Sequence, residues 1–228
     1  MTVKGDIRTP DSPIFAVVEP LPRGPHELSR EQVTASQRGR LMAAFAELMA
    51  RGGYASVNIA ELVALAGVSR ATFYQHFADK EQCMLAAYEQ YAETLMSALV
   101  PLVAEEMPTV GDFVERVVSS YIGVVVRDPV AARAFFVELD GAGPRARARR
   151  RQERQAFITL FEARHAEFRR RDASLGALPQ LAYEALVDAA REIVRDRLDT
   201  EAAPDLLALV PDLTTAFNAM LYGANSQT

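Results

Sequence analysis

The residues with the clearest potential for chemistry lie between Ser69 and Phe77, in the run SRATFYQHF. In a helix with about 100° between successive residues, Phe73 and Phe77 lie on nearly one side. Ala71 and Gln75 lie on the opposite side. The outer surface carries small, hydroxyl, amide, aromatic and basic groups but no acid, and such groups suit phosphate oxygens and base edges. The run therefore favours a DNA-binding helix over its alternative, one arm of an ordinary helical hairpin.

A second short helix precedes this run and positions it. Asn58 is a good N-cap residue, and Glu61, three residues later, completes a capping box. Gly67 falls where the helix needs a left-handed residue in order to stop, a conformation that glycine adopts without a Cβ penalty. Ser69 is then the N-cap of the next helix. Two short helices joined by a tight turn that contains glycine predict a helix-turn-helix.

A resemblance to a known family is carried by the run from Gly53 to Glu81, GYASVNIAELVALAGVSRATFYQHFADKE. This run is similar to the DNA-binding segment of the TetR/AcrR family of transcriptional regulators. The matched features are Gly53-Tyr54, Ala66-Gly67-Val68-Ser69, the Thr72-Phe73-Tyr74 step, Phe77 and Lys80-Glu81. Beyond this segment the resemblance is one of length and helical pattern. It implies a dimer that binds a near-palindromic double-stranded DNA operator and responds to a small-molecule effector.

The predicted DNA-binding residues are Asn58, Ser69, Arg70, Ala71, Thr72, Tyr74, Gln75, His76 and Lys80. Gln75 and Arg70 are expected to read bases, because an amide pairs bidentately with adenine and a guanidinium with guanine. The resemblance assigns phosphate contacts to Thr72, Tyr74, His76 and Lys80. Lys80 also begins the next predicted helix, whose N-terminus attracts phosphate. Ala60 lies where many family members carry a basic or polar residue, so readout is expected to rest more heavily on Arg70 and Gln75.

Length and composition fit one domain or two small ones. The chain has 228 residues, 50% of them hydrophobic, and a formal net charge of −5. This charge argues mildly against bulk nucleic-acid affinity but not against a local site. No run approaches about 18 uninterrupted apolar residues, so no transmembrane span is expected. With no signal peptide and Cys83 as the only cysteine, the sequence predicts a cytoplasmic protein without internal disulfides.

Motifs for catalysis or metal binding are missing from the sequence. His26, His76 and His165 stand far apart, and none has a cysteine or histidine partner at metal-ligand spacing. No G-x-S-x-G, H-E-x-x-H or phosphate-binding glycine loop is present. We therefore expect a protein that is not an enzyme, with no catalytic residue, no metal site and no cofactor.

The helical pattern predicts an all-α protein of three parts. These are a tail at 1–28, a helix-turn-helix DNA-binding domain at 29–80, and a larger helical ligand-binding and dimerisation domain at 81–228. The tail is rich in proline and is expected to be mobile. Lys4, Arg8 and Arg23 leave open the alternative of a DNA-contacting arm. The short apolar run at 14–18 leaves open docking on the body.

Outside the helix-turn-helix, helices are predicted at 29–51, 80–100, 109–126, from 129, at 145–171, at 179–198 and after 205. The first begins at a capping box on Ser29, and its apolar stripe is expected to cover the helix-turn-helix. Arg38 and Arg40 near its start are either phosphate contacts or solvated surface. The second either ends or kinks at Pro101, because proline lacks the amide hydrogen that a helix interior uses.

Aromatic side chains gather in the predicted C-terminal domain, together with a few polar tips. The candidate ligand-binding residues are Phe113, Val117, Tyr121, Phe136, Phe157, Phe161, His165 and Tyr183. Each of them taken singly reads as ordinary core packing. Collectively they predict a pocket for an apolar or amphipathic small molecule.

The last two predicted helices carry broad apolar stripes, so we expect a homodimer through residues 179–221. The same stripes could instead finish the core of the monomer. The leading hypothesis is a ligand-responsive transcriptional regulator, a repressor, that a small apolar or amphipathic effector releases from its operator. The rival hypothesis is an all-helical enzyme or protein-interaction module, which would show no specific binding to duplex DNA.

Overall fold

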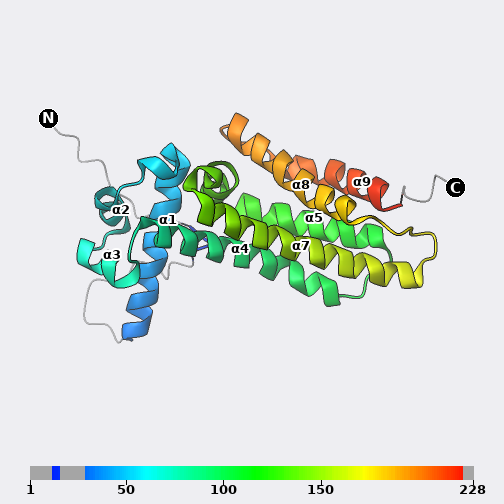
Figure 1. The fold of residues 1–228 in the computed structure, drawn as a ribbon, viewed down its shortest axis with the longest axis horizontal. Coiled ribbons are helices and arrows are strands. Elements are labelled where there is room, and N and C mark those ends of the chain that lie inside the picture. The colour runs from blue at the N-terminus through cyan, green and yellow to red at the C-terminus, as the bar shows by residue number, and fades with distance from the viewer. Residues whose placement is uncertain (1–11, 16–28, 223–228) are drawn as a thin grey trace. The chain divides into compact units, whose positions relative to one another are not determined.

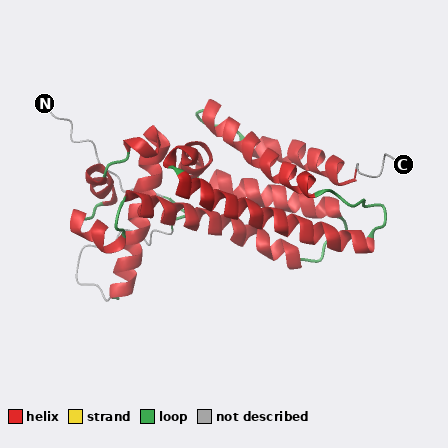
Figure 2. Ribbon diagram, viewed as in Figure 1, coloured by secondary structure: helices red, strands yellow, loops and turns green. Residues whose placement is uncertain are grey.

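A computed structural model of the chain describes residues 12–15 and 29–222, and every regular element among them is a helix (Figures 1 and 2). This confirms the predicted all-α class. The α-helices are α1 Arg30–Ser56, α2 Ile59–Ala66, α3 Arg70–His76, α4 Lys80–Ala104, α5 Val110–Arg127, α6 Pro129–Arg133, α7 Pro144–Arg171, α8 Gln180–Thr200 and α9 Leu209–Tyr222. A π-helical turn, η1, covers Ala134–Glu138, and 3-10 turns cover Leu139–Ala142 (η2) and Leu206–Ala208 (η3).

The described residues form two compact units. The first joins the described residues up to Tyr91 with Asp128–Ala146, and the second joins Ala92–Arg127 with the described residues from Arg147 onward. The unit boundaries therefore fall inside α4 and α7 as well as between α5 and α6. The ranges predicted from the sequence, 29–80 and 81–228, are contiguous and do not anticipate that 128–146 packs with the first unit. That the first of these ranges binds DNA and the second binds ligand stays a prediction.

Helix α1 begins as the sequence predicts. Ser29 Oγ accepts a hydrogen bond from the amide of Gln32, and the Gln32 side chain accepts one from the amide of Ser29. The helix runs past the predicted end at Arg51 and turns sharply at Gly53, whose φ of 75° is open to glycine and strained for other residues. Its apolar stripe is fully buried, as expected from its spacing: Leu41, Phe45, Leu48 and Met49.

The segment 128–146 adds an aromatic cluster to the first unit. Asp128 caps α6 by accepting the amide of Ala131, and Pro129 follows in the first helical position, as predicted. The chain then widens into the π-turn η1, which carries Phe135. The Phe135 ring lies 5.6 Å from that of Tyr88 and 5.3 Å from that of Tyr91, both on α4.

Four residues of the predicted tail lie within the described part of the chain, and they are docked. Phe15 is 1% exposed, and its ring packs edge-on against Phe135 with 6.4 Å between centroids. The Ser12 hydroxyl donates to the Asp128 carboxylate, and Gln90 donates to the carbonyl of Ile14 at 3.0 Å. Ile14 and Phe15 are therefore docked on the first unit. The rest of the predicted tail, including Lys4, Arg8 and Arg23, lies outside the described residues.

Helix α4 is longer than predicted. It continues to Ala104 and carries Pro101 in its interior, so Pro101 does not end the helix. Three helical residues, 102–104, follow the proline before α4 ends. Leu99 and Leu102, which flank Pro101, are buried, and this burial stabilises the helix across the missing backbone hydrogen bond.

The second unit is built on α5 and α7. Helix α5 buries Phe113, Val117 and Ile122, and α9 packs along it with Leu213, Phe217 and Leu221 buried. Glu115, Arg116 and Ser119 keep one strip of α5 exposed to solvent.

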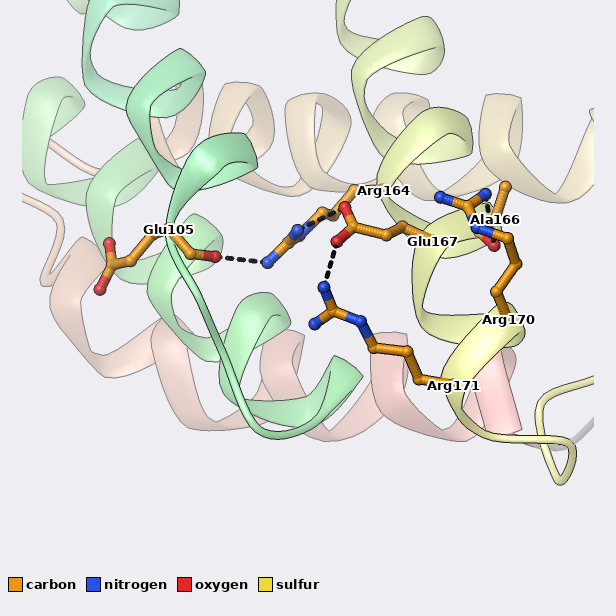
Figure 3. Close-up of polar contacts among 6 residues, drawn as sticks. All are labelled: Glu105, Arg164, Ala166, Glu167, Arg170 and Arg171. Carbon is orange, nitrogen blue, oxygen red and sulfur yellow. Dashed lines mark hydrogen bonds and ion pairs between the residues drawn. The ribbon is translucent and has the colours of Figure 1, made fainter.

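Arg164 fastens α7 to the end of α4 within the second unit (Figure 3). Its side chain is 3% exposed and donates to the backbone carbonyl of Glu105 and to the carboxylate of Glu167. The guanidinium also lies 4.7 Å from the ring centroid of Phe168. Glu167 in turn accepts from Arg171 at 2.8 Å. The charge of Arg164 is thus paired within α7 and one hydrogen bond reaches the end of α4, whereas its buried Nε has no hydrogen-bond partner among the described residues.

Candidate DNA-binding site

Helix α2 is capped by Asn58, the residue that precedes it. Asn58 Oδ1 accepts the amide of Glu61 at 2.9 Å, which confirms the predicted N-cap. The second half of the predicted capping box is wrong, because the Glu61 carboxylate accepts from the side-chain amide of Asn58 at 3.2 Å and not from its backbone. Asn58 is exposed, but its side chain is engaged in holding the helix start.

The turn after α2 is built by Gly67. Its φ of 63° and ψ of 38° are left-handed, as predicted, and the amide of Val68 returns to the carbonyl of Val63 at 3.1 Å. A side chain from α1 completes this helix end: Arg40 donates to the carbonyls of Ala66 at 3.0 Å and Gly67 at 3.3 Å. A cation at a helix C-terminus is favourable both as a donor and because of the helix dipole.

Helix α3 is seated by two phenylalanines. Phe73 is 0% exposed and Phe77 is 3% exposed, and their rings lie 5.9 Å apart, so this side of the helix belongs to the core of the first unit. Ser69 caps the helix by accepting the amide of Thr72 at 3.0 Å. The hydroxyls of Ser69 and Thr72 lie 2.8 Å apart and hydrogen-bond each other.

The opposite side of α3 is open to solvent. Arg70, Ala71, Tyr74 and Gln75 are all exposed. The Arg70 guanidinium lies 5.9 Å from the centroid of the Tyr74 ring, one helical turn away, and makes no ion pair within the described part of the chain. Gln75 likewise makes no hydrogen bond to another described residue. A basic group, an amide and a phenol are thus presented together with their donors available.

His76 lies at the edge of this surface and is tied to α1. Its Nε2 lies 3.1 Å from Gln37 Oε1, so the ring links the recognition side of the unit to its first helix. Burial, and secondarily the nearby Arg38 cation, lower the pKa of His76 from its ordinary value. The ring is therefore mainly neutral at pH 7. Because the amide oxygen of Gln37 only accepts, the single N–H of the neutral ring lies on Nε2 and is already donated. The predicted phosphate contact of His76 stays a prediction.

Lys80, at the start of α4, is already engaged inside the unit. Its ammonium donates to the carbonyls of Tyr54 at 3.1 Å and Val57 at 2.9 Å, and lies 4.5 Å from the centroid of the Tyr54 ring. These contacts fasten α4 to the chain between α1 and α2. An ammonium carries three hydrogens, so one remains for a phosphate, and the predicted phosphate contact stays a prediction.

Arg38 and Arg40 make contacts within the first unit that the sequence did not indicate, Arg38 from an exposed and Arg40 from a half-buried position. Arg40 caps α2 as described, and the Arg38 guanidinium lies 4.7 Å from the centroid of the Phe77 ring. The exposure of Arg38 fits the predicted solvated surface, whereas Arg40 takes a capping role that neither alternative included. A basic residue opposite a helix C-terminus is the signal for such a cap, but it becomes visible only once α1 is known to cross α2.

The predicted ligand-binding residues fall in both units. Phe136 belongs to the first unit, where its ring lies 6.2 Å from that of Tyr91. The others lie in the second unit, and all of these are buried except the half-buried Tyr121. Two direct contacts join members of the set: Phe113 with Phe161, 5.8 Å between ring centroids, and His165 with Tyr183, hydrogen-bonded at 2.7 Å.

A separate open cleft of about 320 Å³ lies where α4 passes into α5. It is lined by Glu105, Glu106, Met107, Pro108, Asp112, Glu115 and Arg116, and so shares no residue with the predicted ligand set. Among the described residues no group of three or more histidine, cysteine, aspartate or glutamate side chains could hold a metal ion. No helix in the described ranges is both long and apolar enough to cross a membrane.

Comparison with protein families identifies the first part of the chain. Residues 41–87 match the model for bacterial regulatory proteins of the tetR family. This range covers the second half of α1, all of α2 and α3, and the start of α4. It thus includes the turn at Gly67 and the exposed side of α3.

Solved structures of similar fold cover most of the chain. The fatty acid degradation regulator FadR from Bacillus halodurans has a TM-score of 0.73 at 18% identity, covering 83% of this chain and 96% of its own. FadR from Bacillus subtilis, solved in complex with stearoyl-CoA, gives 0.69 at 18% identity, with 81% and 98% covered. NalD, the secondary repressor of the MexAB-OprM multidrug efflux pump in Pseudomonas aeruginosa, gives 0.64 at 19% identity, with 81% and 96% covered. At these identities the likeness is one of fold.

Proposed function

Because this chain belongs to the TetR family of bacterial regulatory proteins, we propose that it is a ligand-responsive repressor that binds a near-palindromic operator as a homodimer. The observation that carries the DNA-binding part is the exposed side of α3. Arg70, Tyr74 and Gln75 project from a helix whose other side is locked into the core by Phe73 and Phe77. We expect the protein to act in the cytoplasm, where its operator lies.

Within this proposal the residues of α3 divide their work. Arg70 and Gln75 read base edges in the major groove, since their donors are exposed and make no ion pair or hydrogen bond with other described residues. Ala71 allows close approach because it is small. Tyr74, Thr72 and His76 contact phosphates, and Asn58 and Ser69 present helix starts whose free amides suit an anion.

The experiment that tests DNA recognition is a binding-site selection on random duplexes, with the wild type and a Gln75→Ala variant. The wild type should select a near-palindrome whose half-sites lie about one helical turn or more apart. The variant should lose preference at one or two positions of each half-site, at a cost of about 1–3 kcal/mol there. Selection of no sequence by the wild type would favour the rival module without specific DNA binding. Unchanged preferences in the variant would remove Gln75 as a reader.

The effector of this proposal is an amphipathic molecule with an apolar chain. Buried aromatic side chains in the second unit support it, together with a hydrogen-bonding pair, His165 and Tyr183, among them. Stearoyl-CoA, held by FadR of Bacillus subtilis, is a molecule of this kind. An effector that binds the DNA-free state more tightly weakens DNA binding by the same coupling free energy, typically about 1–3 kcal/mol.

The dimer of this proposal uses the exposed apolar side chains of α8, η3 and α9. Leu181 is 72% exposed, and Ile193, Leu207, Met220 and Tyr222 are also exposed. Phe217, which is also on α9, is by contrast only 4% exposed and belongs to the monomer's own core. The buried side of these helices therefore belongs to the monomer core, and the exposed side is the one that we propose for the dimer. Phe217→Asp would test folding more than association.

Leu181→Asp is the sharper test of the dimer. A charge placed in an apolar interface loses its hydration without a partner, so the variant should be monomeric in analytical ultracentrifugation at micromolar concentration while the wild type sediments as a dimer. Because Leu181 is exposed within the chain, thermal unfolding of the dissociated variant should remain cooperative. A wild type that sediments only at 25.0 kDa would contradict the proposed dimer.

A further inference from the structure

His165 is a buried side chain with one satisfied and one unsatisfied ring nitrogen. It is 2% exposed, and its Nδ1 lies 2.7 Å from the hydroxyl oxygen of Tyr183. Its Nε2 is buried and has no hydrogen-bond partner among the described residues. A buried polar atom without a partner costs about 1–3 kcal/mol, so a role in binding is one physical reason for its retention.

The hydrogen atoms of this pair can be assigned by counting donors. If the Tyr183 hydroxyl donates to Nδ1, the ring carries its hydrogen on Nε2, and only that hydrogen lacks an acceptor. If Nδ1 donates to Tyr183, the hydroxyl hydrogen has no acceptor among the described residues and Nε2 has no donor. The first arrangement leaves fewer buried groups unsatisfied and is therefore favoured. Nε2 is then a hydrogen-bond donor.

The side of α7 that carries His165 is aromatic. Phe161, His165 and Phe168 follow one another along a single side of α7 at helical spacing. The ring of Phe113, on α5, lies 5.8 Å from Phe161 and 5.9 Å from Phe168, and so contacts the residues that precede and follow His165 on this side of α7. Phe157 and Phe161 keep 9% and 7% of their surface exposed, so the stripe is least sealed at the end away from Phe168.

Two nearby cations on α7 are engaged with other groups. Arg164 is paired with Glu167, and Arg169 donates to the carbonyl of Leu175. Burial, and secondarily the cation of Arg169, lower the pKa of His165, which keeps the ring neutral at pH 7. A neutral donor among aromatic rings satisfies an uncharged acceptor well and a carboxylate poorly, because a buried anion needs an opposite charge.

We propose that His165 is the polar anchor of the effector site and that its Nε2–H donates a hydrogen bond to the carbonyl oxygen of an uncharged acyl group, a thioester or ester, whose apolar chain lies along Phe113 and Phe161. This inference rests on the proposed ligand response and adds the chemical class of the ligand. Tyr183 acts as a positioning residue, since its hydroxyl fixes the tautomer that makes Nε2 the donor.

A pair of matched probes tests the inference on the full-length protein. One is the decanoyl thioester of N-acetylcysteamine, and the other is the thioether of equal length in which a methylene replaces the acyl carbonyl. Calorimetric titration should show that the wild type binds the thioester about three- to tenfold more tightly, the range expected for one hydrogen bond in a buried site. Decanoic acid, as a third probe, should bind more weakly than the thioester because its charge is uncompensated.

Substitutions at His165 test whether this side chain causes the preference for the thioester over the thioether. His165→Phe should bind thioester and thioether equally, since it keeps the aromatic volume and removes the donor. His165→Gln, whose terminal amide reaches about as far as Nε2, should restore part of the preference, whereas His165→Asn, which is shorter, should not. Tyr183→Phe should reduce the preference without abolishing it, because the ring stays and the tautomer is no longer fixed.

Three results would overturn the inference. These are equal binding of thioester and thioether by the wild type, binding of neither, and a preference that persists in His165→Phe. The wild-type comparison needs no variant to fold, so it stands even if a substitution destabilises the protein. Operator binding, measured separately, decides the proposed function: selective DNA binding with no carbonyl preference would retain the regulator and remove only its acyl ligand.

Discussion

Helix α3 and the stripe of α7 that contains His165 both carry polar side chains on a helix that packs through aromatic residues, and they differ in what those polar groups meet. On α3, Arg70 and Gln75 face solvent, opposite the buried Phe73. On α7, His165 lies on the same buried side as Phe161 and Phe168. On α3 the polar and apolar side chains thus lie on opposite sides of the helix, whereas on α7 they lie on the same buried side.

This difference decides what a substitution reports. An exposed reader such as Gln75 has water as its partner in the free protein, so its loss should alter DNA recognition and leave folding intact. A buried group such as His165 or Arg164 contributes to packing as well as to any ligand, so its loss alters both. The predictions below test this contrast, beginning with the largest expected effect.

Phe73→Ala should destabilise the first unit most. Phe73 is fully buried and contacts the rings of Tyr74 and Phe77 at 5.3 and 5.9 Å, and loss of a buried phenylalanine costs about 3–5 kcal/mol. Gln75→Ala, two residues away and exposed, is the matched control and should change stability by less than about 0.5 kcal/mol. Urea unfolding measures both. Equal effects would show that the two sides of α3 are not separate as described.

Arg164→Ala should have the next largest effect, in the second unit (Figure 3). The change leaves the carbonyl of Glu105 and one oxygen of Glu167 without their donor and removes the guanidinium from Phe168. We expect a loss of about 2–3 kcal/mol in unfolding free energy, because the donor is charged and buried. Arg171→Ala removes the exposed partner of the same carboxylate and should cost less than about 1 kcal/mol. A smaller loss for Arg164 than for Arg171 would contradict the fastening role.

Lys80→Ala should give a smaller loss of stability together with a change in DNA binding. Its ammonium donates to the carbonyls of Tyr54 and Val57 from a half-buried position, and removing these bonds should cost about 1 kcal/mol. If the remaining hydrogen meets a phosphate, affinity should fall for all DNA sequences alike and the salt slope should decrease by about one unit per subunit. Arg70→Ala is the control, with stability retained. An unchanged salt slope for Lys80→Ala would assign the residue to the fold alone.

The local devices of the helix-turn-helix could be predicted from the sequence because each depends on residues close together in the chain. Asn58, Ser69 and Gly67 cap or end short helices through groups within four positions of themselves, and residue type largely specifies such contacts. The apolar side of α3 also followed from spacing alone. The structural framework of the candidate DNA-binding site was therefore visible before any fold was known.

Contacts between distant segments could not be predicted in the same way. Arg40 meets the end of α2 across 26 positions, Lys80 meets Tyr54 across 26, and Ser12 meets Asp128 across 116. In each case the residue type allows several partners, and only the packing of helices selects one. The same reason explains Phe217, whose spacing fitted a dimer interface and a monomer core equally well until α5 was placed beside α9.

The net pH dependence of stability between about pH 5 and 7 should be weak, because a buried histidine and a half-buried glutamate oppose each other. Burial lowers the pKa of His165 below its ordinary 6.5. The unfolded chain then binds more protons than the native state, so this histidine makes stability fall as pH drops below 6.5. Burial raises the pKa of Glu153 from 4.5 to about 7, against the opposite influence of Arg191. The native state then binds more protons, so Glu153 makes stability fall as pH rises from 4.5 toward 7.

Two substitutions should separate these opposing contributions. Glu153→Gln keeps the size of the side chain and removes its titration, so its unfolding free energy should fall more steeply than that of the wild type as pH drops from 7 to 5. For His165→Phe the unfolding free energy should fall less steeply than that of the wild type as pH drops from 7 to 5, or should rise. His76, whose pKa is also lowered, acts in the same direction as His165, so His76→Gln should shift the curve as His165→Phe does. Urea titrations at pH 5, 6 and 7 measure these slopes. If Glu153→Gln and His165→Phe moved the slope in the same direction, at least one of the two groups would not have the buried environment that its neighbours create.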